Sequence, residues 1–183
     1  AAEVKAVRER VGIIDLTAFT KVEVSGPAAY ALLDRLTANR MPQKTGSITL
    51  THMLNERGRI ELETTIVRMS EDRFYLGCAA FFEQRLLDHL AKHGAGAAAT
   101  VIALSDKWSA LAINGPRARD VLGACTDADL TNAGFRWLSA QEITVAGHKI
   151  WAMRVSFAGE LGWELHMPNA ACLDIYTALW AAG

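Results

Sequence analysis

Glu63 is the first of two carboxylates in this chain whose local sequence suggests chemistry. It lies in a segment, 59–67, that alternates polar and apolar residues, as does segment 47–54 before it, and the turn Asn55–Gly58 separates the two. This pattern predicts a β-hairpin. Pairing the strands symmetrically about the turn predicts one shared face that carries two carboxylates and an imidazole. The expected pairs are Leu54 with Arg59, His52 with Glu61 and Leu50 with Glu63, on the same face as Ile48 and Thr65.

Two interpretations of this hairpin face remain open. If the face is solvated, its carboxylates are ordinary surface charges. If it lies against the duplicated half, Glu63 is a partly desolvated carboxylate between apolar neighbours, which is how proteins prepare a carboxylate for proton transfer.

The second carboxylate is Glu160, which lies in a turn between two apolar segments and is flanked by Gly159 and Gly162. Glycines at a strand connection permit unusual turn geometry and a close approach of the backbone to a ligand. A carboxylate pointing inward from such a turn could accept two parallel N–H donors from a planar heterocycle. An exposed hairpin turn is the alternative interpretation.

An internal repeat predicts the elements that position these carboxylates. A strand, a Gly-Pro turn and an apolar helix occur at Gly26-Pro27 and again at Gly115-Pro116, 89 residues later. At the same offset, 74–76 and the helical pattern after it correspond to 163–165 and its helix. We therefore expect an α+β protein of two tandem ferredoxin-like halves, 1–94 and 95–183, with mostly antiparallel sheets packed as one duplicated unit. A seam between such halves is a natural place for a small ligand.

The individual elements follow from periodicity and turn residues. The first half is expected to have helices at 27–38 and 80–93 around three strands at 47–54, 59–67 and 73–78. The second is expected to have helices at 116–125 and 169–180, with strands near 109–114, 142–145, 148–157 and 163–167.

Composition excludes several classes of partner. The 183 residues include 19 Lys and Arg against 20 Asp and Glu, so the chain lacks the basic surface that nucleic acid requires. No apolar run approaches the roughly 18 residues that a membrane span needs. Three scattered cysteines predict neither a disulfide nor a metal site, and His89 and His93 have no third metal ligand near them in the sequence. We therefore expect no nucleic-acid, membrane or metal partner.

Three motifs together resemble a known family. They are 11–16 with 21–27, the stretch from Leu54 to Arg68, and the turn Gly159–Glu164. In combination they are similar to the folate-binding aminomethyltransferase domain of the glycine-cleavage T-protein and of the C-terminal region of dimethylglycine and sarcosine dehydrogenases. The sequence of this turn, Gly-Glu-Leu-Gly-Trp-Glu, is more similar to the dehydrogenase branch than to the T-protein branch.

The resemblance implies a tetrahydrofolate cofactor. If residues that match the family's motifs have the family's roles, Glu160 binds the pterin and Glu63 is the catalytic carboxylate that assists proton transfer. The same resemblance implies that Thr65, Gly77 and Leu50 line the pocket. Two residues depart from the family pattern, because Glu63 stands where members usually carry Asp and Ala79 stands where T-proteins commonly carry Asn.

The resemblance also implies a reaction and its partners. The domain would form methylene-tetrahydrofolate from an oxidised methylamine of the dimethylglycine or sarcosine type, with an amine or iminium as the small-molecule substrate. An FAD-dependent oxidoreductase domain of the same parent chain would make the iminium, and both that domain with its FAD and a C-terminal β-rich domain would lie outside this chain. The expected location is the cytoplasm, or the mitochondrial matrix in a eukaryote. The alternatives are a glycine-cleavage aminomethyltransferase and a non-catalytic folate-binding or scaffold module.

Overall fold

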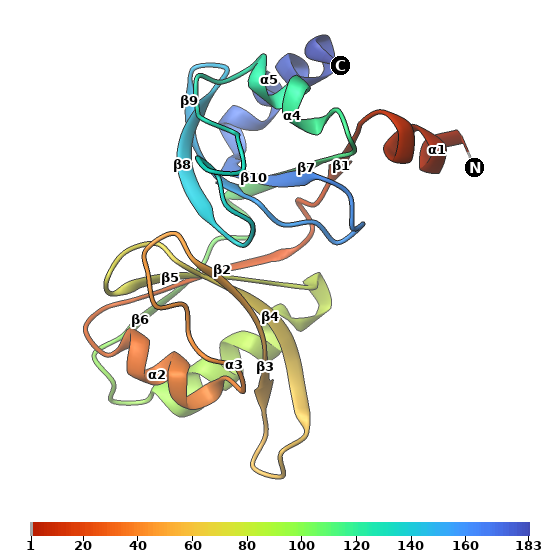
Figure 1. Cartoon of the computed structure of the whole chain (residues 1–183). Helices are drawn as coiled ribbons and strands as arrows, with labels where there is room; N and C mark the ends of the chain where they lie inside the picture. Colours follow the sequence, from red (N-terminus) through yellow and green to blue (C-terminus); the bar gives the residue numbers. More distant parts are fainter. Residues whose placement is uncertain (1) are drawn as a thin grey trace. The chain divides into compact units, whose positions relative to one another are not determined.

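The computed structural model describes residues 2–183 and divides into two compact units, each built on a five-stranded sheet (Figure 1). Unit 2 is Ala18–Asp106, and unit 1 combines the residues up to Thr17 with Lys107–Gly183. Every strand pairing within the described residues is antiparallel. The predicted α+β class with antiparallel sheets is confirmed.

Unit 2 has the sheet order β3-β4-β5-β2-β6, and its core lies between that sheet and two helices. Leu32, Leu33 and Leu36 of α2 and Leu86 and Leu90 of α3 are buried against strand residues of this core. The bounds are β2 Thr20–Ser25, α2 Ala29–Leu36, β3 Ile48–Leu54, β4 Ile60–Arg68, β5 Arg73–Cys78, the 3₁₀ helix η1 Ala80–Phe82, α3 Glu83–Gly94 and β6 Thr100–Ala103.

Unit 1 repeats this plan with the order β1-β7-β10-β9-β8. Its core includes Val121 and Leu122 of α4, Ile175 and Leu179 of α5, and the fully buried Trp163 of β10. The bounds are α1 Ala2–Glu9, β1 Gly12–Asp15, β7 Trp108–Asn114, α4 Ala118–Gly123, β8 Ala140–Val145, β9 His148–Met153, β10 Gly162–Pro168 and α5 Asn169–Ala182.

The two Gly-Pro turns show the duplication directly. The Gly26 N–H donates to Asp72 O, and the Gly115 N–H donates to Leu161 O, with both acceptors as well as both donors 89 residues apart. Both glycines have a positive φ, 114° and 132°, a backbone conformation that residues with a side chain rarely adopt.

The expected halves 1–94 and 95–183 differ from the units observed, because the repeats exchange their first strands. β1 pairs with β7 of unit 1, and β6 pairs with β2 of unit 2. A boundary after residue 94 therefore assigns both strands to the wrong sheet. Helix α1, which is exposed and has no buried residue, was not predicted from the sequence.

Candidate functional site

Three of the predicted site residues form one row across the sheet of unit 2. Leu50 of β3 is paired with Thr65 of β4, and Thr65 is paired with Gly77 of β5. Their side-chain positions lie on the face opposite α2 and α3, since the alternate residues Leu76 and Ile66 belong to the helix-packed core. Three residues that the family resemblance named on three strands therefore lie side by side.

Glu63 lies beside this row and is paired across the strands with His52. The Nε2 atom of His52 is 3.2 Å from the Oε2 atom of Glu63, and the two side chains are 41% and 60% exposed. The predicted grouping of Glu63 with His52, Leu50 and Thr65 on one face is thus present. Its own unit therefore leaves the Glu63 side chain more than half exposed.

The predicted hairpin register was wrong by two residues. The observed pairs are Leu50 with Thr65, His52 with Glu63 and Leu54 with Ile60. The turn is one residue longer than expected, with the Asn55 N–H donating to Arg59 O, and a bulge after Met53 adds another residue to β4.

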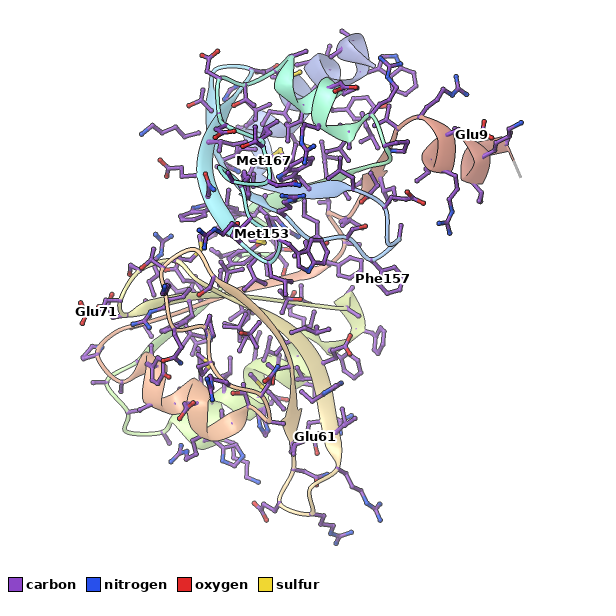
Figure 2. The ribbon with its side chains drawn as sticks, in the orientation of Figure 1. Glu9, Glu61, Glu71, Met153, Phe157 and Met167 are labelled. Carbon is purple, nitrogen blue, oxygen red and sulfur yellow. The ribbon has the colours of Figure 1, made fainter. Side chains whose placement is uncertain are left out.

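The bulge also moves Glu61 away from the predicted face. Its carboxylate lies within 2.5 Å of Arg85 Nη2 on α3, near the tip of the hairpin (Figure 2). A hydrogen bond from the Asn55 side chain and the Arg85 guanidinium lower the pKa of Glu61. The placement of Glu61 beside Glu63 was therefore wrong.

Gly77 leaves open space in the row. A Cβ built on this glycine would have Thr20 O, at 3.8 Å, as its nearest neighbour, which is an ordinary contact. The fold would accept a side chain here, so packing does not explain the glycine. Its absence of a side chain lets a flat ligand approach the backbone between Thr65 and the next strand.

Lys21 continues the row on β2, where it is paired with Gly77, and sequence reasoning missed it. Lys21 is 1% exposed and donates from Nζ to Phe19 O at 2.7 Å. The alternation of Lys21 and Glu23 with Val22 and Val24 was the available signal, because it places both charged residues on the face opposite the core.

Glu160 belongs to unit 1, in the loop that precedes β10. Its side chain is 19% exposed, and its Oε1 atom accepts a hydrogen bond from Arg8 Nη1 at 2.7 Å. Nearby Phe157 is fully exposed and labelled in Figure 2. The Glu160 side chain is thus largely buried, and its Arg8 partner was not predicted.

Glycine is required on the two sides of Glu160 for different structural reasons. Gly159 has a φ of 79°, in the left-handed region. A Cβ on Gly162 would lie 2.2 Å from Asn114 Oδ1, so the start of β10 packs too closely for a side chain. Together they fix where the chain passes from the loop into β10.

A separate cavity of about 460 Å³ lies between the β3–β4 turn and α3. None of the predicted site residues lines it. Two of its carboxylates are neutralised locally, Glu61 by Arg85 and Glu56 by Lys92. It is lined by Asn55, Glu56, Arg57, Arg59, Glu61, Arg85, Asp88, His89, Lys92 and His93.

Residues 2–183 contain neither a cluster of metal-ligating side chains nor a membrane-spanning helix. No group of three or more His, Cys, Asp or Glu side chains there is arranged to hold a metal ion. No helix there is long and apolar enough to cross a membrane.

The architecture places the chain in the class of aminomethyltransferase-type folds. It superposes on the glycine cleavage system aminomethyltransferase T from Bartonella henselae with a TM-score of 0.85 and 27% identity, over 97% of this chain and 47% of that one. All of residues 1–183 match the model of the GCVT N-terminal domain, and the chain belongs to this family. The family resemblance seen in the sequence is confirmed.

Two curated relatives from Mus musculus are similar across the whole chain. The mitochondrial dimethylglycine dehydrogenase is 34% identical over 100% of this chain and 21% of its own length. The mitochondrial sarcosine dehydrogenase is 33% identical over 99% of this chain and 21% of its own length. The chain therefore spans about a fifth of these enzymes.

Proposed function

We propose that this chain is a tetrahydrofolate-dependent one-carbon transferase domain of an amine-oxidising enzyme. The observation that carries the proposal is the row Leu50, Thr65 and Gly77 with Glu63 beside it, since three adjacent strands supply an apolar contact, a hydroxyl and an open backbone next to one carboxylate. Family membership and relatives named as dimethylglycine and sarcosine dehydrogenases support it.

Each residue has a physical role in this proposal. Gly77 leaves room for a flat ring against β5, Leu50 offers an apolar surface that is 53% exposed, and Thr65 offers a hydroxyl. Glu160 is proposed separately, on the family resemblance, as an acceptor of hydrogen bonds from the N–H edge of the pterin. When bound, tetrahydrofolate supplies the nitrogens that take up the one-carbon unit.

Glu63 handles protons in this reaction. An iminium carbon loses its positive charge when a nitrogen nucleophile attacks it, and the attacking nitrogen must then release a proton. A carboxylate beside the reacting atoms stabilises the positive charge and accepts that proton. In the complete transfer two nitrogen–carbon bonds form to this carbon and one breaks, so two protons are released, the departing amine takes up one of them, and one net proton leaves through Glu63 to solvent. The contact with His52 holds Oε2 of Glu63 and leaves Oε1 for this task.

The substrate class and the rest of the enzyme are part of the proposal. An oxidised methylamine of the dimethylglycine or sarcosine type fits the names of the two relatives, and an FAD-dependent oxidoreductase domain of the same protein would produce it. Both relatives are named as mitochondrial, so we propose the mitochondrial matrix for a eukaryotic protein and the cytoplasm for a bacterial one.

A second candidate is glycine-cleavage aminomethyltransferase activity, which the structural match to aminomethyltransferase T favours. It would act on an aminomethyl group presented by a carrier protein. Assaying the complete protein with a methylamine and with an aminomethylated carrier separates the two, because each enzyme consumes only its own donor.

Anaerobic calorimetric titration of the complete protein with tetrahydrofolate tests the proposal. We expect saturable binding that Glu160→Gln weakens by at least about tenfold, as expected for loss of a charged hydrogen-bond acceptor. Glu142→Gln is the matched control, since Glu142 is a carboxylate of the same unit in an exposed pair with Lys149. Absence of binding in the wild-type protein would contradict the proposal.

A further inference from the structure

Arg8 and Glu160 are joined across 152 residues of sequence within unit 1. The 2.7 Å separation of Arg8 Nη1 and Glu160 Oε1 is that of a strong charge-assisted hydrogen bond. The Glu160 side chain is 19% exposed and that of Arg8 is 65% exposed, so the carboxylate is the more sheltered of the two partners. Arg8 is the one side chain in residues 2–183 shown hydrogen-bonded to Glu160.

The backbone fixes the end of α1 from which Arg8 extends. The Arg117 N–H donates to Arg10 O at 2.9 Å, and Gly115 lies against the backbone of Val7 and Arg10 so closely that a Cβ would be 2.5 Å from Arg10 O. A methyl group of Val7 also occupies the space that a Cβ of Gly12 would need. Although α1 buries no residue of its own, Arg8 therefore starts from a defined position.

The loop that carries Glu160 has less support of its own. Phe157, Ala158 and Gly159 are exposed, and the loop is anchored just beyond Glu160, where Leu161 O accepts the Gly115 N–H. A glutamate on such a loop has several rotatable bonds, and fixing them on ligand binding costs free energy. The contact with Arg8 reduces this cost because it restricts the carboxylate before a ligand arrives.

We propose that Arg8 is a positioning residue for Glu160 that holds its carboxylate in the orientation required to bind the N–H edge of a planar heterocycle. This inference rests on the proposed function. A carboxylate has about four lone-pair sites, and Arg8 uses one on Oε1, so Oε2 and the remaining sites stay available to two ligand N–H groups.

A positioning role and a blocking role predict opposite signs. If Arg8 orients Glu160, its removal weakens ligand binding. If Arg8 instead occupies the place of the ligand, a bound ligand must displace it, and its removal strengthens binding.

The test is anaerobic titration of the complete protein with tetrahydrofolate in the variants Arg8→Met and Arg8→Lys. We expect Arg8→Met to raise Kd by about tenfold, the size of one hydrogen bond to a charged group, and Arg8→Lys to restore part of the loss because it keeps the charge without the planar fork. In a Glu160→Gln background, Arg8→Met should cause no further loss, because the two residues act as one.

Lys5→Met is the matched control, since it removes a cation of the same helix that pairs with Glu9 at 3.9 Å at the surface. Unchanged or tighter binding in Arg8→Met would overturn the inference while leaving the proposed function intact, provided that the wild-type protein binds and Glu160→Gln binds more weakly. Additive losses in the double variant would also overturn it, because Arg8 would then act elsewhere. A wild-type protein that binds no folate would instead remove the proposed function on which the inference rests.

Discussion

His52 and Glu63 face each other across β3 and β4, with 3.2 Å between Nε2 and Oε2. The pair lies directly beside the row formed by Leu50 and Thr65. Because Glu63 carries one methylene more than an aspartate, its carboxylate has an additional torsion to restrict. The contact with His52 supplies that restriction from the neighbouring strand.

Glu63→Gln should separate binding from chemistry. The amide keeps the size of the side chain but accepts no proton, so tetrahydrofolate binding should stay within about twofold while turnover falls by about 10² or more, the usual contribution of a general base. Titration and the rate of methylene-tetrahydrofolate formation in the complete protein measure the two. Glu56→Gln, in the exposed turn pair with Lys92, is the control. Full turnover in Glu63→Gln would favour a scaffold role instead.

His52→Leu should reduce the same rate by a smaller factor, about three- to tenfold, because a polar contact between two exposed side chains contributes about 1 kcal/mol or less. The reduction should vanish in a Glu63→Gln background if His52 acts through Glu63. His148→Leu breaks a comparable surface pair with Asp174 in unit 1, at 2.9 Å, and should leave the rate unchanged. An equal rate loss in both histidine variants would contradict the specific role of His52.

Gly77→Leu should impair binding without impairing folding. The nearest neighbour of a Cβ at this position is 3.8 Å away, so the strand accepts a side chain, and the larger leucine would fill the space above the row. We expect a Kd at least about tenfold higher with an unfolding free energy within about 1 kcal/mol of the wild type. Gly77→Ala adds only one methyl group, so its Kd should lie between those of the wild type and Gly77→Leu. Unaltered binding in Gly77→Leu would place the ligand elsewhere.

The sequence predicts local features well and fails where distant segments meet. Both the Gly26 and the Gly115 turn need a positive φ and a close backbone neighbour, and only glycine meets both requirements well. A single residue type in the sequence therefore marks each turn. The exchange of β1 and β6 could not be predicted, because each strand has four residues and its partner lies far along the chain.

The candidate site shows the same division. Alternation along β3 and β4 placed Leu50, Glu63 and Thr65 on one face, and an error of two residues preserves that face because side chains alternate with a period of two. The bulge that moves Glu61 toward Arg85 has no clear sequence signal. The partner of Glu160 is 152 residues away, so no local pattern indicates Arg8.

Gly115→Ala should destabilise the protein much more than Gly147→Ala. The first substitution combines a φ of 132° with a Cβ 2.5 Å from Arg10 O, and the second has a φ of 81° with no atom within 4 Å. We expect losses of about 3 kcal/mol or more and about 1 kcal/mol, respectively, measured by urea unfolding. Equal losses would show that α1 does not pack under Gly115 in solution.

His89 should make the protein less stable as the pH falls below about 6.5, the ordinary pKa of histidine. Burial of the ring is the main cause that lowers the pKa of His89; His93, Lys92 and Arg85 lower it further, and Glu61 opposes them. The folded state therefore binds fewer protons at this residue than the unfolded state, so the unfolding free energy decreases as the pH falls from 7.5 to 5.5.

Comparing urea unfolding at these two pH values measures the contribution of His89. His89→Gln should show a smaller decrease than the wild type, because glutamine does not titrate and its amide can still occupy the half-buried site, where Nε2 of His89 has no hydrogen-bond partner in the described residues. His148→Gln, at an exposed pair with Asp174, controls for loss of any histidine. An unchanged pH dependence in His89→Gln would mean that the ring is solvated and that the packing of α3 against the hairpin is looser than observed.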